Sequence, residues 1–304
     1  MTRMAERAPA SPVSPVILSA SRATDIPALY GEWLLRRLRA GWCGWVNRRN
    51  GRAQRVSFAR ARAIVFWTKN PAPLIPRLAE IDDLGFDHCT NFTLNDYEAE
   101  RLEPGIPPLD ERIETFARLA EIVGPARVVW RFDPILVGGA LTPAAVLERI
   151  ARVGDLVHRH TRRLVISFAD VACYPAARSR LRAHGGVGEA EPKATDVEII
   201  AAGIADLNRA WGLELSACAE PYDLSCFGIR PGRCVDDALL ARAFPGGAGL
   251  PKDPGQRPLC GCAVSKDIGR YGTCTHGCVY CYATQSHAAA SSANARHDPD
   301  AEFL

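Results

Sequence analysis

Short apolar, β-branched runs alternate along the chain with amphipathic segments of helical period. The expected strands are VILSA (16–20), AIVFWT (63–68), HCTNFTL (88–94), RVVWRF (127–132), RLVISF (163–168) and LELSAC (213–218). The expected helices are 27–40, 73–84, 109–123, 143–160, 195–211 and 236–243. A repeated order of strand and helix is typical of a parallel sheet. We therefore expect an α/β fold, and a full or partial (βα) TIM-like barrel accommodates this order more naturally than an open sheet does.

The pattern divides the chain into four regions. They are a disordered N-terminus (1–15), the βα barrel (16–243), a Gly/Pro-rich linker leading into a C-terminal cysteine-rich segment (244–282), and a disordered tail (283–304). Within the barrel, 41–47 and 52–58 flank an Asn-Gly turn and predict a β-hairpin. A surface loop is expected over 183–195.

Composition excludes little but points to metal chemistry. The 304 residues include 37 basic and 34 acidic ones, a balance that gives no reason to expect a nucleic-acid or membrane partner from charge alone. The start lacks the apolar core of a secretion signal, and no stretch is apolar enough to span a bilayer, so we expect a cytoplasmic protein. Cytosolic thiols stay reduced, so the eleven cysteines indicate metal ligation or redox chemistry rather than disulfides.

The most specific signal is the Cys-x3-Cys-x2-Cys spacing of Cys274, Cys278 and Cys281. A tight loop of this kind can bind three irons of a [4Fe-4S] cluster and leave the fourth iron open. Gly277 supplies the backbone freedom that such a loop needs, and Tyr280 could shield the cluster. An open iron can chelate S-adenosylmethionine, and one electron would then split it into methionine and a 5′-deoxyadenosyl radical.

The string GCVYCYA (277–283) resembles the cluster loop of radical SAM proteins, most closely the spore photoproduct lyase branch. The whole chain resembles the bacterial family called domain of unknown function 1848. The strings that carry this second resemblance are SASRATDIPALYGEW (19–33), IVFWTKNP (64–71), LEPGIPPLDERIETF (102–116), WRFDPI (130–135), VISFAD (165–170) and CAEPYDLSCFGI (218–229). These resemblances imply a barrel with a cluster. In radical SAM proteins the cluster loop follows the first strand, whereas here it follows the last, so only the three cysteines are carried over.

Other cysteines leave alternatives open. A structural zinc site could use three of these cysteines with Cys260, Cys262 or His276. A candidate second site consists of Cys218, Cys234, Cys260 and Cys262, which could bind a zinc ion or another cluster or could be buried, unligated thiols. If they bind a metal, their sulfurs should lie within about 4 Å of one another for zinc and about 6 to 7 Å for a cubane.

Polar residues follow strand after strand. Chemistry in a βα barrel gathers at the C-terminal strand ends. We expect catalytic roles for Lys69, Arg131, Asp133 and Glu220, and cofactor-binding roles for Arg22, Asp25, Asn70 and Tyr280. Each could instead form a salt bridge or a cap, as Asp25 could for the helix near Pro27.

Function is expected to follow from the cluster. The leading hypothesis is a radical-SAM-like enzyme that reductively cleaves S-adenosylmethionine. Its electron donor would be a ferredoxin or flavodoxin, and similarity to the lyase branch suggests a nucleic-acid lesion as substrate. The alternatives are a zinc-stabilised barrel that hydrolyses or binds a ligand, and an electron carrier or sensor. Radical chemistry requires the loop 274–281 to cover the C-terminal mouth of the barrel, whereas a structural zinc would fasten it elsewhere.

Overall fold

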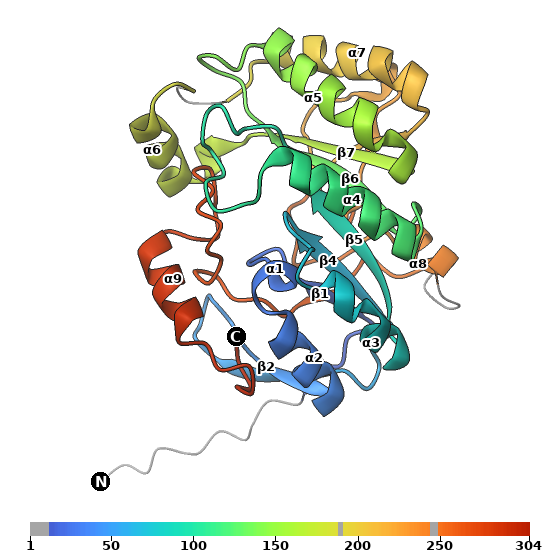
Figure 1. Ribbon diagram of the computed structural model, residues 1–304, viewed down its shortest axis with the longest axis vertical. Helices are drawn as coiled ribbons and strands as arrows, with labels where there is room; N and C mark the ends of the chain where they lie inside the picture. The colour runs from blue at the N-terminus through green and yellow to red at the C-terminus, as the bar shows by residue number, and fades with distance from the viewer. Residues whose placement is uncertain (1–11, 188–190, 244–248) are drawn as a thin grey trace.

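The computed structural model describes residues 12–187, 191–243 and 249–304, and its centre is one eight-stranded sheet (Figure 1). The strands are β1 (Ile17–Ala20), β4 (Ala63–Thr68), β5 (Asp87–Thr93), β6 (Val128–Ile135), β7 (Arg163–Phe168), β8 (Glu214–Ala217), β9 (Arg230–Pro231) and β10 (Lys266–Asp267). Their order is β10-β1-β4-β5-β6-β7-β8-β9, and every neighbouring pair is parallel. The α/β class is confirmed. Within the described residues β9 and β10 are free edges, so the full barrel is not found.

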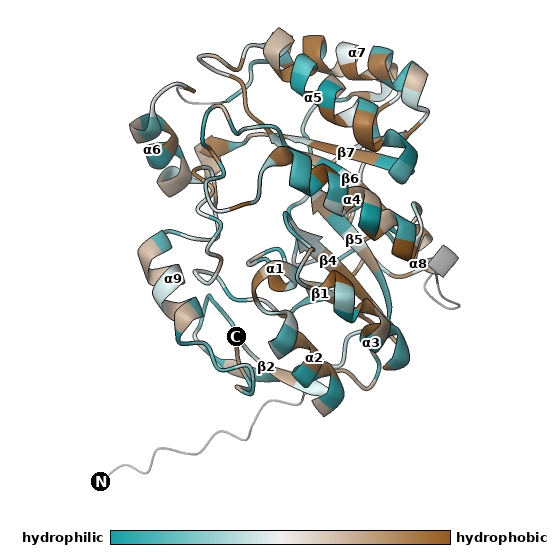
Figure 2. Cartoon of the chain, viewed as in Figure 1, coloured by the Kyte–Doolittle hydropathy of each residue, from teal (hydrophilic) through white to brown (hydrophobic). Residues whose placement is uncertain are grey.

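Helices cover one face of the sheet (Figure 1). They are α1 (Ile26–Leu29), α2 (Gly31–Ala40), α3 (Leu78–Asp83), α4 (Leu109–Val123), α5 (Pro143–Val157) and α7 (Ala194–Trp211). Short 3₁₀ turns lie at η1 (Ile75–Arg77), η2 (His158–His160), η3 (Val171–Cys173) and η4 (Ser225–Phe227). In Figure 2 the strands under α4 and α5 are mainly hydrophobic, while these helices carry hydrophilic residues outward. Phe66, Phe92 and Trp130 are among the buried strand residues on this outer face.

Residues 234–243 and 249–263 cover the opposite, inner face. Alternate strand residues such as Val65, Val129 and Val165 pack there against Val235 and Leu240, which belong to this segment and to its helix α8 (Asp237–Ala243). Because both faces of the sheet are buried, its strands are almost continuously apolar, as expected for parallel strands. The described residues of this stretch, which the sequence predicted to be the last barrel helix and a linker, therefore form part of the core.

The hairpin and the C-terminal tail lie together. Strands β2 (Trp42–Val46) and β3 (Ala53–Ser57) pair antiparallel, as the Asn-Gly turn predicted. Residues 283–304, expected to be disordered, instead form α9 (His287–Ala295) and an irregular end with turns. Gly44 N–H donates to the carbonyl of Glu302 (2.8 Å), the Trp33 indole donates to that of Ala301 (2.9 Å), and Leu304 is buried. The tail is held by backbone hydrogen bonds as well as by Phe303 and Leu304, and the bonds made by its backbone are not revealed by a polar, Ala/Ser-rich sequence.

Other boundaries differ from expectation in detail. Helix α6 (Pro175–His184) was not expected, and it takes up the first two residues of the expected loop 183–195. Residues 1–11, 188–190 and 244–248 lie outside the described residues. Val13, inside the expected disordered N-terminus, bridges to Val56 of the hairpin.

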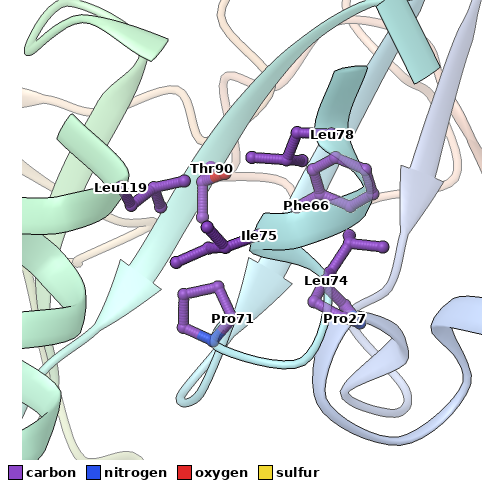
Figure 3. A pocket seen from close by; sticks show the side chains of 8 residues that line it. All are labelled: Pro27, Phe66, Pro71, Leu74, Ile75, Leu78, Thr90 and Leu119. Carbon is purple, nitrogen blue, oxygen red and sulfur yellow. The ribbon is translucent and has the colours of Figure 1, made fainter. Parts of the chain in front are cut away.

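A small gap in the helix-covered face belongs to the core. Figure 3 shows it between the α3 region and strands β4 and β5, lined mainly by apolar side chains such as Leu74, Leu78 and Leu119. Its volume of about 10 Å³ is the space of about one water molecule, so it is no ligand site.

Candidate functional site

The inner face of the sheet changes from apolar to polar toward the C-terminal strand ends. Along β6, buried Val129 is followed on the same face by Arg131 and Asp133, and along β7 Val165 is followed by Ser167. Arg131 is 2% exposed, and its guanidinium donates to the Asp133 carboxylate. This polar end of the inner face is where a parallel sheet places its chemistry.

The short strand β10 brings the cysteine loop to this end of the sheet. It pairs parallel with β1, with Leu18 opposite Lys266 and Ser19 opposite Asp267. The Asp267 carboxylate accepts hydrogen bonds from Ser19 Oγ (2.9 Å), Ser21 Oγ (2.6 Å) and the N–H of Arg22 (2.8 Å). Since parallel strands run the same way, residues after Asp267 leave the sheet beside the end of β1. The cysteine loop comes after the last strand in the sequence, yet it lies beside the first strand.

Cys274, Cys278 and Cys281 all lie in this loop, where Thr284 contacts both the Cys281 sulfur and the Cys274 carbonyl. Cys278 is buried, and Gly277 takes a left-handed φ of 71° that a residue with a side chain rarely adopts. Burial raises the pKa of the Cys274 thiol to about 12, and burial also raises that of Cys278 well above its ordinary value. These thiols stay neutral unless a bound metal ion displaces their protons.

His276 and the loop after β5 fix the position of the cysteine loop. His276 is buried, its Nε2 lies 2.8 Å from the Asp25 carboxylate, and its Nδ1 lies 3.3 Å from the carbonyl of Gly105. Its carbonyl accepts the Gly105 N–H (2.8 Å), and Val279 N–H donates to the carbonyl of Leu102 (2.9 Å). Both ring nitrogens of His276 are thus engaged away from the thiols. The zinc alternative that uses His276 as fourth ligand does not fit this arrangement.

A buried ionic group lies against the same loop. Glu103 Oε1 accepts from Lys69 Nζ (2.7 Å), Asn95 Nδ2 (3.1 Å) and the Tyr280 hydroxyl. Burial acts to raise the pKa of Glu103, but the charges of Lys69 and Arg112 outweigh it and hold the pKa below its ordinary value. Tyr280, expected to shield the cluster, is therefore tied to the strand-end residues through Glu103.

The four cysteines of the candidate second site converge, although they come from three separate segments. Cys218 and Cys234 have their sulfurs 3.2 Å apart, the N–H of Cys234 lies 3.3 Å from the sulfur of Cys262, and Cys260 contacts Cys262. Contacts with the sulfurs of Cys218 and Cys262 raise the pKa of the Cys234 thiol, while the contact with Cys234 lowers the pKa of Cys218 to about 7.

Two arginines and two carboxylates border these thiols. Arg131 Nη1 lies 2.8 Å from the sulfur of Cys234, and the guanidinium groups of Arg22 and Arg131 lie 4.9 and 5.1 Å from the Trp67 ring. Glu220 Oε1 accepts from the N–H of Phe168 (2.9 Å) and from Ser167 Oγ (3.1 Å). Burial raises the pKa of Glu220 to about 7, and the negative charge of Asp133 adds to the shift.

The expected site residues therefore fall into two neighbouring groups. Asp25, Lys69 and Tyr280 lie around the cysteine loop, where Asp25 Oδ2 also accepts the N–H of Lys69 (2.7 Å). Arg22, Arg131, Asp133 and Glu220 lie around the second thiol group. Asn70 joins neither group, because its Oδ1 accepts the N–H of Ala72 (3.2 Å) within the turn after β4.

Neither cluster of cysteines has the arrangement of a metal site in this structure. Across the described ranges, no three His, Cys, Asp or Glu side chains are positioned to hold a metal ion. The contacts in the second group run from one cysteine to the next rather than around a common centre.

Comparison with known proteins gives a family and no function. The sequence model of a family described as a domain of unknown function, DUF1848, matches residues 17–283. The chain belongs to this family. No curated protein and no solved structure matches it. No described helix is long and apolar enough to cross a membrane.

The region matched by DUF1848 runs from the first residue of β1 to the end of the cysteine loop, so it contains both thiol groups. It also contains two important residues that sequence reasoning missed, Glu103 and Asp267. A charged residue inside LEPGIPPL was a signal for Glu103, since a Glu among apolar and Pro residues is expected to be buried only with a partner. Asp267 gave no such signal, because its role depends on a strand of two residues.

Proposed function

We propose that this DUF1848 protein is an iron–sulfur enzyme that works as radical SAM proteins do. Cys274, Cys278 and Cys281 would hold a [4Fe-4S] cluster, and S-adenosylmethionine and substrate would bind at the polar end of the inner face. The uninterrupted parallel order of β1, β4, β5, β6, β7 and β8, with helices outside, supports reading the sheet as a partial barrel.

The observation that carries the proposal is the parallel pairing of β10 with β1. It accounts for the one departure of this chain from radical SAM order, because the loop reaches the end of the first strand despite its late position in the sequence. The alternative placement, at the bottom of the barrel or on its flank, would have suited only a structural metal.

The donor set also suits a cluster with one open iron. The loop offers three thiols, and His276, the nearest further donor in the loop, is occupied by Asp25 and Gly105. When bound, such a cluster supplies one electron, taken from a ferredoxin or flavodoxin, that splits S-adenosylmethionine into methionine and a 5′-deoxyadenosyl radical.

The surrounding residues suggest how the chain would assist. Lys69 lies near Cys278, and its ammonium has N–H groups beyond the one given to Glu103, so it can bind the S-adenosylmethionine carboxylate. Asp133 and Glu220 can accept hydrogen bonds from an amino group, a ribose or a substrate. With its pKa near 7, Glu220 can also exchange a proton at neutral pH.

The raised pKa of Glu220 also favours a second candidate function. A carboxyl group of raised pKa next to Asp133 is what a hydrolase without S-adenosylmethionine would use. Such an enzyme would need no iron in the cysteine loop.

The test is anaerobic purification followed by metal analysis and activity. We expect a brown protein with about four irons per chain, an electron paramagnetic resonance signal after dithionite that changes when S-adenosylmethionine is added, and formation of 5′-deoxyadenosine. Cys278→Ala should lose the iron, whereas Cys226→Ala, an exposed thiol outside both groups, should keep it. Iron retained in Cys278→Ala, or no iron after reconstitution of the wild type, would refute the cluster. An intact cluster without 5′-deoxyadenosine would refute radical chemistry.

A further inference from the structure

The second thiol group lies where segments from both edges of the open sheet meet. Cys218 directly follows β8, and Cys234 lies three residues after β9, at one edge. Cys260 and Cys262 precede β10, at the other edge. Thiol contacts run from Cys218 through Cys234 and Cys262 to Cys260. The ladder of β8 and β9 already joins the first two segments, whereas the contact from Cys234 to Cys262 connects the two edges of the described sheet, which are not paired with each other. Cys234, Cys260 and Cys262 are buried.

The backbone is built to hold these sulfurs close to one another. The N–H groups of Cys234 and Val235 point at the Cys262 sulfur, at 3.3 and 3.4 Å. Ala263 N–H donates to the carbonyl of Val235 (3.0 Å). Gly232 N–H donates to the carbonyl of Ala217 at 2.6 Å, and a Cβ on Gly232 would lie 2.8 Å from that same oxygen. Two segments are thus fixed side by side with their thiols facing.

The charges around the group suit an anionic centre. Arg131, almost completely buried, places Nη1 2.8 Å from the Cys234 sulfur. Arg22 contacts the Cys262 thiol, and its buried Nη2 has no hydrogen-bond partner. Arg131 also pairs with Asp133, and Arg22 lies near Asp267, but both guanidinium groups face the sulfurs as well. One divalent ion with four thiolates carries a net charge of −2, so these two cations would lie beside the negative charge of the bound ion.

We propose that Cys218, Cys234, Cys260 and Cys262 bind one tetrahedral zinc ion that ties the residues after β9 to the end of β8 and to the start of β10. Two sulfurs bonded at about 2.3 Å to one tetrahedral zinc lie about 3.8 Å apart. The observed 3.2 Å between Cys218 and Cys234 therefore needs to open by about half an ångström, and the row of four thiols has to close around one centre when the ion binds. Sulfurs around a cubane would lie much farther apart. Binding releases the thiol protons to solvent, so four thiols and Zn²⁺ give the tetrathiolate and four protons.

This site is independent of the proposed cluster, so the test removes the cluster first. We would prepare the variant Cys274→Ala/Cys278→Ala/Cys281→Ala, dialyse it against EDTA and measure metals by mass spectrometry. We expect about one zinc per chain and no iron. Adding Cys234→Ser should reduce zinc to background. Adding Cys89→Ala, a buried thiol on the same inner face outside the group, should leave it bound.

A second measurement covers the case in which the Cys234 variant does not fold. Wild-type chain refolded anaerobically with cobalt(II) should show the intense d–d and thiolate charge-transfer bands of a tetrahedral tetrathiolate site, and added zinc should abolish them. The proposal is overturned if the triple variant holds no zinc or holds iron and sulfide instead. It is equally overturned if zinc survives in a folded Cys234→Ser variant, or if mass spectrometry finds a Cys218–Cys234 disulfide in the anaerobic protein.

Discussion

The buried ion pair between Lys69 and Glu103 gives the sharpest test of how the cysteine loop is held. Its atoms lie 2.7 Å apart, and the two side chains are 16% and 3% exposed. Glu103 also accepts the Tyr280 hydroxyl, so the pair links β4, the loop after β5 and the cysteine loop. In Lys69→Met the nearest remaining cation of Glu103 is Arg112, at 3.9 Å from its other oxygen.

The loss of stability expected for Lys69→Met follows from this geometry. Removing one member of a buried pair typically costs about 3 to 5 kcal/mol, because the other charge is left uncompensated. The charge of Arg112 remains, so we expect about 3 kcal/mol. A chain of 304 residues has an unfolding entropy of roughly 0.6 kcal/mol/K, so the melting temperature should fall by about 5 °C. The double variant Lys69→Met/Glu103→Gln should be less destabilised than the two single changes add up to, by about 1 kcal/mol or more.

The assay is thermal and urea denaturation followed by far-UV circular dichroism. Arg39→Met is the matched control, because its pair with Glu80 is exposed to solvent and should contribute little to stability. Burial opposes the charged form of both groups, but the charge of Glu103 raises the pKa of Lys69, and the charge of Lys69 lowers that of Glu103. The stabilisation is therefore fully present at neutral pH and is lost in acid as Glu103 protonates through its lowered pKa. A loss no larger than that of the control, or strictly additive single changes, would refute the reasoning.

Three further outcomes are expected. The pKa of Glu220 is raised to about 7 in the folded chain, so between about pH 4.5 and 7 the folded chain keeps a proton that the unfolded chain has lost. The free energy of unfolding should therefore fall by up to about 3 kcal/mol over this range. Glu220→Gln should abolish this fall in urea titrations, and an unchanged pH dependence in the variant would contradict the prediction. Gly105→Ala would place a Cβ 2.6 Å from the backbone oxygen of His276, so bound iron should drop while circular dichroism stays native. Phe303→Ala should speed tryptic cleavage after Arg296, because the Phe303 ring packs on the hairpin, and equal rates would count against a docked tail.

Much of the sheet could be predicted from sequence, because its strands are buried on both faces and its helices carry one apolar side. The runs at 63–68 and 163–168 became strands at the same residues, and Thr142 caps the helix that begins at Pro143. These features depend on local pattern. The hairpin around Asn50-Gly51 is another, because its turn chemistry is local too.

What could not be predicted depends on contacts between distant parts of the chain. Strand β10 has two residues, too few for any periodic pattern, yet it decides where the cysteine loop lies. The order of the tail likewise rests on backbone groups of 301–302 that meet Trp33 and Gly44. Glu103 could be suspected from its apolar surroundings, but its partner Lys69 could not be chosen from the other cations of the chain.

Asp267 explains why a strand this short suffices. Two ladder positions contribute little alone, and the carboxylate adds three hydrogen bonds to Ser19, Ser21 and the N–H of Arg22. A Cβ on Gly269 would lie 1.9 Å from Ser21 Oγ, so the chain can approach β1 this closely only through glycine. The end of β1 is thus bonded to a segment some 250 residues later. A loop joined to the first strand by such contacts can take the place that a directly following loop would occupy, so late position in the sequence is no obstacle to chemistry at the strand ends.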